Sequence, residues 1–171
     1  MIDYKVRLGD VFTINDVDKI ALEDHAQAEY VMFLEGELKK PISERRDPET
    51  VLKNTRDGLV AEHWLTEHKG YTNFDEKYMD VLHPDGFHVE VKTVSTYGGV
   101  PATNQRIRDT FTKLWRRRVQ WRQKIADHVM LFTRHYDEYT CHSFYQWAEE
   151  KNNWECVNKM WYNEFGGKEY A

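Results

Sequence analysis

Three charged residues stand among apolar neighbours in the stretch YMDVLHPDGFHVEVKT, Tyr78–Thr93. They are Asp80, Glu90 and Lys92, on two strand-like segments joined by a short turn. Charged side chains are almost never buried without a partner. Two carboxylates that lie together suit a divalent cation such as Mg²⁺, and a neighbouring lysine can hold a water or stabilise charge on a phosphorus centre. The pattern therefore indicates metal-assisted chemistry.

The turn between the two segments decides whether the carboxylates meet. Pro84-Asp85-Gly86 has the residues of a three-residue hairpin loop that closes in a glycine bulge. That loop places Asp80 opposite Glu90 on one side of the sheet, with Lys92 on the same side. A two-residue loop would instead put the two carboxylates on opposite faces. The other reading of the pattern is an exposed ion pair between Lys92 and the two acids.

Periodicity and end signals predict the elements around this hairpin. The predicted helices cover about 16–39, about 47–69 and about 105–125, with a loop from Gly98 to Gln105 before the last of them. The predicted strands cover 71–74, 77–82, 87–95 and 128–136. The fold class is therefore α/β (α+β), with a mixed central sheet flanked by helices. We expect one domain over 1–171, with a core at about 47–136, a helical N-terminal extension over 1–46 and a helical, aromatic-rich C-terminal extension over 137–171.

Asp80, nine intervening residues and then Glu90-Val91-Lys92 resemble the motif of the PD-(D/E)XK nucleases, the restriction-endonuclease-like superfamily. The element order over 47–136 is also similar to that family's core. Glu62, in the segment GLVAEHW of the preceding helix, matches the family's helical glutamate. The position before the first acid departs from the pattern, because Met79 stands where the family's name has a proline.

The resemblance implies a restriction-endonuclease-like core and a metal-dependent DNA endonuclease that hydrolyses phosphodiester bonds. Glu62, Asp80, Glu90 and the Val91 carbonyl would bind Mg²⁺, with Mn²⁺ as an alternative, and Lys92 would position the attacking water. The enzyme would be structure-selective, junction-cleaving, or restriction-like or homing-like. Cleavage of both strands would call for a homodimer.

Basic residues are concentrated in one segment. Between Arg106 and Lys124 there are eight basic residues and one acid, a charge of +7, which leaves −12 for the rest of a chain whose net charge is −5. If the segment is one helix, Arg106, Lys113, Arg117 and Lys124 fall on one line along it. Arg118 and Arg122 fall in the apolar arc, so they need an anionic partner or the helix ends before them. The segment indicates a phosphate-binding face or a solvated helix face.

Composition excludes several classes of protein. No apolar run approaches the roughly 20 residues that span a bilayer, and no signal peptide is visible at the N-terminus. Cys141 and Cys156 follow no metal-ligand spacing and are too few for a disulfide framework. We therefore expect DNA as the partner, no membrane association and an intracellular, cytoplasmic location, as for a phage-encoded enzyme acting in a bacterial host. Two alternatives stay open, a non-catalytic nucleic-acid-binding protein on the same scaffold and a protein-interaction domain.

Overall fold

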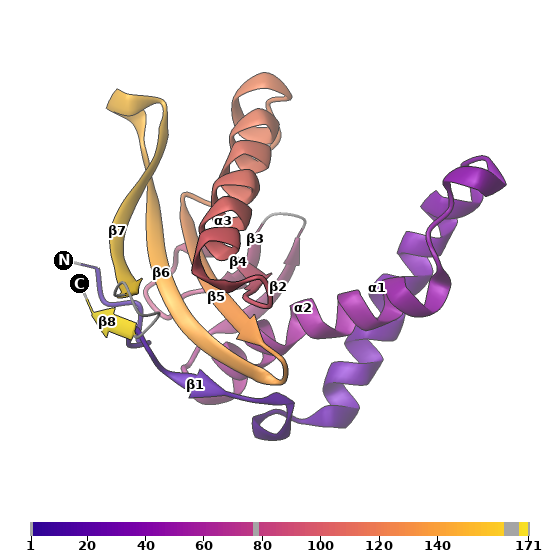
Figure 1. Ribbon diagram of the computed structural model, residues 1–171, viewed down its shortest axis with the longest axis horizontal. Coiled ribbons are helices and arrows are strands. Elements are labelled where there is room, and N and C mark those ends of the chain that lie inside the picture. The colour runs from indigo at the N-terminus through magenta and orange to yellow at the C-terminus, as the bar shows by residue number, and fades with distance from the viewer. Residues whose placement is uncertain (1, 77–78, 163–167, 171) are drawn as a thin grey trace.

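The computed structural model describes residues 2–76, 79–162 and 168–170 (Figure 1). The helices are α1 Lys19–Leu38, α2 Pro48–His68 and α3 Gly99–Trp115. The strands are β1 Val11–Phe12, β2 Thr72–Glu76, β3 Met79–Leu82, β4 His88–Ser95, β5 His128–His135, β6 Glu138–Ala148, β7 Asn153–Tyr162 and β8 Lys168–Tyr170. Within the described residues, no helix has the length and apolar character to cross a membrane.

The strands form a mixed, curled sheet in the order β2-β3-β4-β5-β6-β7-β8, and β1 pairs with β6 (Figure 1). β2, β3 and β4 are antiparallel neighbours. β4 and β5 are parallel, and α3 makes the crossover between them. Because all other pairs are antiparallel, the mixed sheet predicted from the sequence is confirmed.

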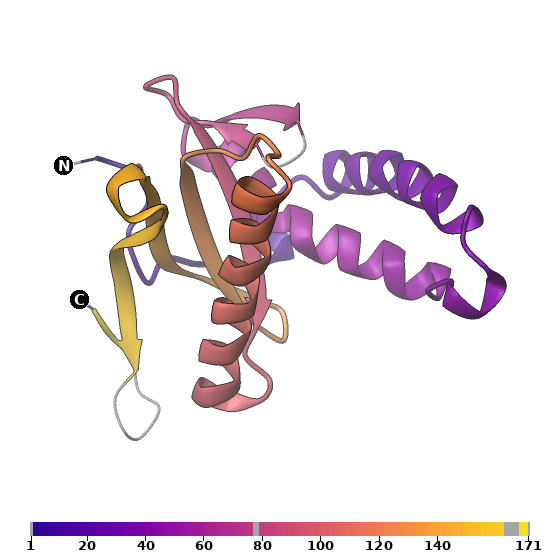
Figure 2. The ribbon, with the colours of Figure 1, turned by 90° about the horizontal axis from the view of Figure 1, so that it is seen from above.

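The first two helices begin and end where local signals place them. The Asp18 side chain accepts hydrogen bonds from two backbone N–H groups at the start of α1, and Asp47 caps α2, whose first residue is Pro48. After α2 the chain turns at Gly70, where φ is +77°. α1 and α2 form an antiparallel hairpin that projects to one side of the sheet (Figures 1 and 2).

Opposite faces of the sheet carry different helices. Val89, Val91 and Met130 belong to a core cluster with the buried face of α2. Val129, the neighbour of Met130, packs instead with Leu114 of α3 and Trp154 of β7. Since successive residues of a strand point to opposite sides, α2 and α3 cover the two faces.

The predicted helix over 105–125 is wrong at both ends. α3 begins at Gly99, within the predicted loop, because Pro101 is favourable in the first turn of a helix, where its missing N–H has no partner to lose. Its regular part ends at Trp115 and continues as a π-helical turn, Arg116–Gln120. Arg122 then adopts a left-handed conformation with φ of +53°, which ends the helix.

The predicted C-terminal helices over 137–171 are also wrong, because the described residues there form strands apart from a short 3-10 turn. Trp147 and Trp154 are partners across β6 and β7 rather than positions on one helix. Asn152, with φ of +49°, makes the turn between those strands. Aromatic residues have high strand propensity, so Trp147 and Trp154 suit two strands joined by a turn. At the N-terminal end of the chain, β1 pairs with β6. The N-terminal extension is therefore helical only after Phe12.

The β3–β4 hairpin has the predicted register. Val81 pairs with Val89 and Leu82 with His88, a register that places Asp80 and Glu90 on the same side of the sheet. The Gly86 N–H donates to the His83 carbonyl at 2.9 Å, and the φ of Gly86 is +99°. The left-handed glycine therefore fixes the register that brings the two carboxyls to one side.

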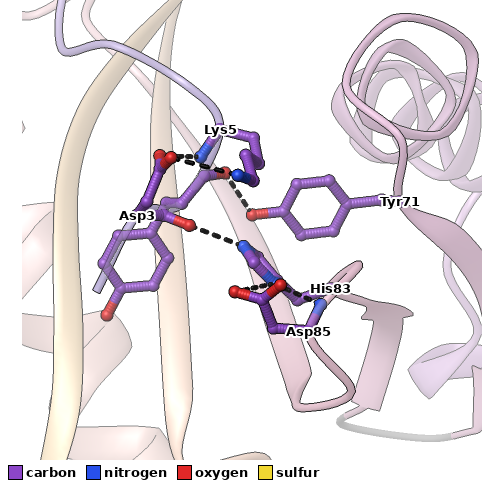
Figure 3. A network of polar contacts seen from close by, with 6 residues as sticks. Asp3, Lys5, Tyr71, His83 and Asp85 are labelled. Atoms are coloured by element: carbon purple, nitrogen blue, oxygen red, sulfur yellow. Dashed lines mark hydrogen bonds and ion pairs between the residues drawn. The ribbon is translucent and has the colours of Figure 1, made fainter.

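The N-terminal segment holds this turn in place (Figure 3). His83 is 1% exposed, and its Nε2 lies 2.7 Å from the Asp3 carbonyl oxygen. The Asp85 N–H donates to Nδ1 of the same ring at 2.9 Å, which leaves Nε2 as the donor to Asp3. Beside it, the Tyr71 hydroxyl donates to the Tyr4 carbonyl at 2.6 Å. A neutral histidine thus joins the turn to the chain's first residues.

We expect Gly86→Ala to lower the free energy of unfolding by about 1–2 kcal/mol, because an L side chain is strained at positive φ. A Cβ at Gly86 would meet nothing within 4 Å, so the loss of stability would come from the strained backbone conformation and not from a steric clash. The matched control is Gly36→Ala in α1, where a Cβ also meets nothing within 4 Å. That change should raise stability by about 0.5–1 kcal/mol, because alanine favours a helix. Urea unfolding measures both, and equal effects would contradict the role of Gly86.

Candidate active site

The structure brings Glu62, Asp80, Glu90 and Lys92 together from α2, β3 and β4. Lys92 Nζ lies 3.2 Å from Glu90 Oε1. The Val91 N–H donates to Asp80 Oδ2 at 2.8 Å, so an aspartate side chain takes a hydrogen bond that a paired strand would otherwise take. The backbone pairing of β3 with β4 joins Val81 to Val89 and Leu82 to His88, and Asp80 contacts β4 through this side-chain hydrogen bond.

Burial and mutual repulsion dominate the electrostatics of the carboxyl cluster, by which we mean Glu62, Asp80 and Glu90. Glu62 is 8% exposed, and its pKa lies well above the ordinary value because of burial first and then the charges of Asp80, Glu29 and Glu90. Burial also raises the pKa of Asp80, although the Val91 N–H and Lys92 oppose that rise. The three groups therefore resist carrying three negative charges together.

The opposition between burial and negative charge is clearest at Glu90. Its side chain is buried, and desolvation followed by the Asp80 charge raises its pKa to about 8, even though Lys92 acts in the opposite direction. Its Oε1 faces Lys92, whereas Oε2 is buried and has no hydrogen-bond partner within the described part of the chain. A buried carboxylate oxygen without a partner is unfavourable unless it is protonated or meets a cation.

The carboxyl cluster offers ligands for a metal but is not arranged as a complete coordination site. Among the described residues, no three His, Cys, Asp or Glu side chains are arranged as a ready metal site. Instead, the raised pKa values of Glu62, Asp80 and Glu90 favour keeping protons on these carboxyl groups. An all-oxygen donor set with one unsatisfied oxygen fits Mg²⁺, which would replace those protons.

Helix α1 contributes neighbours that the sequence did not indicate. Glu29 lies close enough for its charge to raise the pKa of Glu62. His25 Nδ1 lies 2.9 Å from Nε2 of His63, the residue after Glu62, and its Nε2 lies 3.4 Å from Glu29 Oε1. The spacing of His25 and Glu29, one helical turn apart, is the only local signal, and it does not reveal that α1 folds back beside α2.

The predicted basic residues do not form one ridge. Arg106 donates to the Ser95 carbonyl at 2.7 Å from the first half of α3, and Lys113 is exposed near its end. Arg117 lies in the π-helical turn, which shifts it from the helical line, and Lys124 lies beyond the helix. The line of four residues predicted for a helix over 105–125 is therefore wrong.

Arg118 and Arg122 illustrate both outcomes that the sequence left open. Arg118 has an anionic partner, since its guanidinium donates to Asp127 Oδ1 at 2.7 Å and lies over the ring of Trp147 at 4.1 Å. Arg122 lies after the end of the helix and is exposed.

Comparisons with family models, with curated proteins and with solved structures find no match to this chain.

Burial of the carboxyl cluster predicts an unusual pH dependence. The folded pKa of Glu90, about 8, exceeds the ordinary value of 4.5, so the folded protein retains a proton that the unfolded chain releases. Without metal, Glu90 alone should therefore lower the free energy of unfolding by on the order of 4 kcal/mol as pH rises from about 4.5 to 8. Glu90→Gln should remove this contribution, as measured by urea unfolding in EDTA, whereas Glu62 and Asp80, whose pKa values are also raised, keep theirs.

The matched control is Glu35→Gln, the same chemical change at an exposed position of α1. It should leave the pH dependence of wild type unchanged. Equal pH dependence in wild type and Glu90→Gln would show that Glu90 is not held protonated by burial.

Proposed function

We propose that this protein is a metal-dependent DNA endonuclease with a PD-(D/E)XK-type core. The observation that carries the proposal is the buried carboxyl cluster with Lys92 at 3.2 Å from Glu90 and an unpartnered oxygen, Glu90 Oε2. A purely structural site has little reason to bury three acids together, because leaving them apart would avoid the repulsion. Perturbed carboxyls grouped with a lysine are typical of catalytic sites.

The topology around the cluster supports the family assignment. The chain runs α2, β2, β3, β4, α3 and β5, with three antiparallel strands followed by a parallel one. This is the core order that the sequence motif led us to expect, with Asp80 on the second of these strands and Glu90 and Lys92 on the third.

Each residue of the site has a chemical task under this proposal. Glu62, Asp80, Glu90 and the Val91 carbonyl would hold Mg²⁺, or Mn²⁺ in its place. When bound, the metal would neutralise charge on the phosphoryl oxygens and acidify the attacking water.

Lys92, kept in position by its ion pair with Glu90, would orient that water and donate hydrogen bonds to the reacting oxygens. The water oxygen bonds to phosphorus, the bond to the 3′ oxygen breaks, and that oxygen takes a proton. The products are a 5′-phosphate and a 3′-hydroxyl.

The charge distribution favours a polyanionic substrate. Most of the segment from Arg106 to Lys124 is exposed on a chain that is acidic elsewhere. Such a segment attracts the phosphates of a nucleic acid and positions its backbone, but it does not recognise the base sequence. One cluster cuts one strand, so cleavage of both strands would require a second copy of the chain.

We expect Mg²⁺-dependent cleavage of linear duplex, single-stranded or four-way-junction DNA, abolished by EDTA. Asp80→Asn, Glu90→Gln and Lys92→Met should each lower the rate at least about 100-fold, because each removes a group that acts on the transition state. Gel assays of labelled DNA measure the cutting. The matched controls are Glu35→Gln and Lys39→Met, which change the same residue types on or beside α1 at exposed positions.

Two other outcomes would reject the endonuclease. Binding of DNA without cutting on any substrate, unchanged in the site variants, would favour a non-catalytic nucleic-acid-binding protein. Neither binding nor cutting would favour a protein-interaction domain.

A further inference from the structure

A groove lies between residues of the β3–β4 hairpin and the segment that follows α3. In the ribbon, that segment passes near the hairpin (Figure 2). The volume of the groove is about 540 Å³, and its lining includes Met79 and His88 of the hairpin and Arg118, Arg122, Gln123 and Lys124 of the segment. We refer to this cavity as the basic groove. Its volume lies in the range of sites that hold one small molecule.

The basic groove and the carboxyl cluster share strand β4. Met79 immediately precedes Asp80 in β3, so these two side chains point to opposite sides of the sheet. His88 lies two residues before Glu90 in β4, so both side chains point to the same side of the sheet, with their Cα atoms about 7 Å apart. A ligand in the groove would therefore lie next to whatever the carboxyl cluster binds.

The charge of the groove suits a phosphate. Arg118 is neutralised by Asp127 at 2.7 Å, but Arg122 and Lys124 have no ion-pair partner within the described part of the chain and are exposed. The Gln123 N–H donates to the Arg117 carbonyl at 2.8 Å, and the left-handed Arg122 turns the chain there. This turn, rather than a regular helix, brings both cations to the rim of the groove.

The wall of the groove also contains polar atoms that suit a base. His88 Nδ1 and Gln123 Oε1 are buried and have no hydrogen-bond partner among the residues that the structure describes. The His88 ring packs edge-on against Phe74, with the ring centroids 4.3 Å apart. A buried polar atom without a partner is unfavourable, and a ligand with donors and acceptors of its own would satisfy such atoms after a small side-chain rotation.

We propose that the basic groove binds one unpaired nucleotide of the substrate strand, next to the phosphate that is cut. Arg122 and Lys124 contact its phosphate, and His88 and Gln123 contact its base. A groove of about 540 Å³ has room for one nucleotide. Contact of His88 and Gln123 with the edge of a base requires that the base is unpaired or turned out of the helix, so the enzyme acts at such a base. The proposal rests on the proposed nuclease function for the identity of the strand.

Binding of fluorescent single-stranded oligonucleotides in EDTA tests the groove without cleavage. The double variant Arg122→Ala, Lys124→Ala should bind about 10-fold more weakly, and the slope of log K against log salt should fall by about 1.4, since each phosphate contact contributes about 0.7 on a single strand. Gln123→Ala should weaken binding less and leave that slope unchanged. The matched control is Lys39→Ala, at the tip of the α1–α2 hairpin away from the sheet, which should bind as wild type does (Figure 1).

Cleavage in Mg²⁺ gives the second test, with duplexes that are perfectly paired, that carry one unpaired nucleotide, or that carry an abasic residue at that position. We expect at least 10-fold faster cutting beside the unpaired nucleotide. The preference should be lost with the abasic residue and in Gln123→Ala.

The outcomes separate the two proposals. Cutting of all three duplexes at one rate, unchanged in Gln123→Ala, would overturn the groove proposal and leave the nuclease standing. Groove-dependent binding of single strands, with no cutting of any substrate, would support the groove and reject the nuclease. Equal binding by wild type and by the Arg122→Ala, Lys124→Ala variant would overturn the groove proposal whatever the protein cuts.

Discussion

Three clustered carboxyl groups, of which Glu62 and Glu90 are buried and Asp80 is half-buried, are the constraint around which the rest of this structure is arranged. Glu62 and Glu90 are almost completely shielded from water, and the pKa of each is raised by burial and by its acidic neighbours. Lys92 supplies one positive charge to three acids. The cluster is therefore incomplete as an electrostatic unit, and only protons or a further cation can relieve it. That incompleteness distinguishes it from a structural salt bridge.

The fold holds this unfavourable arrangement by fixing each acid from a different element. α2 is anchored in the main core by Val60 and Leu65, both 0% exposed, so Glu62 cannot move away. The hairpin register is set by Gly86 and by the contact of His83 with Asp3 (Figure 3). Strain of this kind persists where the surrounding structure determines the position of each group, as it does at functional sites.

Acidic and basic regions lie side by side in the molecule. Strand β4 links the two, because His88 lines the basic groove and Glu90, two residues later on the same side, belongs to the carboxyl cluster. The departure of α3 from regular helical geometry creates this proximity, because a straight helix would carry Arg122 and Lys124 onward along its axis. π-Helical turns are often found at functional sites. A groove with free cations next to an acidic cluster suits a ligand that carries phosphate and contacts metal at the same time.

By itself, the sequence determined the features that depend on neighbouring residues. Turn chemistry in HPDGF fixed the hairpin register, and Asp47-Pro48 fixed the start of α2, since caps and turns involve residues only a few positions apart. The tertiary structure alone decided that α1 brings Glu29 beside Glu62, that Trp147 and Trp154 pair across strands, and that Arg122 lines a groove. Contacts between distant segments leave no local periodic signal, and aromatic residues spaced every seven positions suit a helix or two strands with a turn equally well. The packing of the whole chain determines which of these two structures forms.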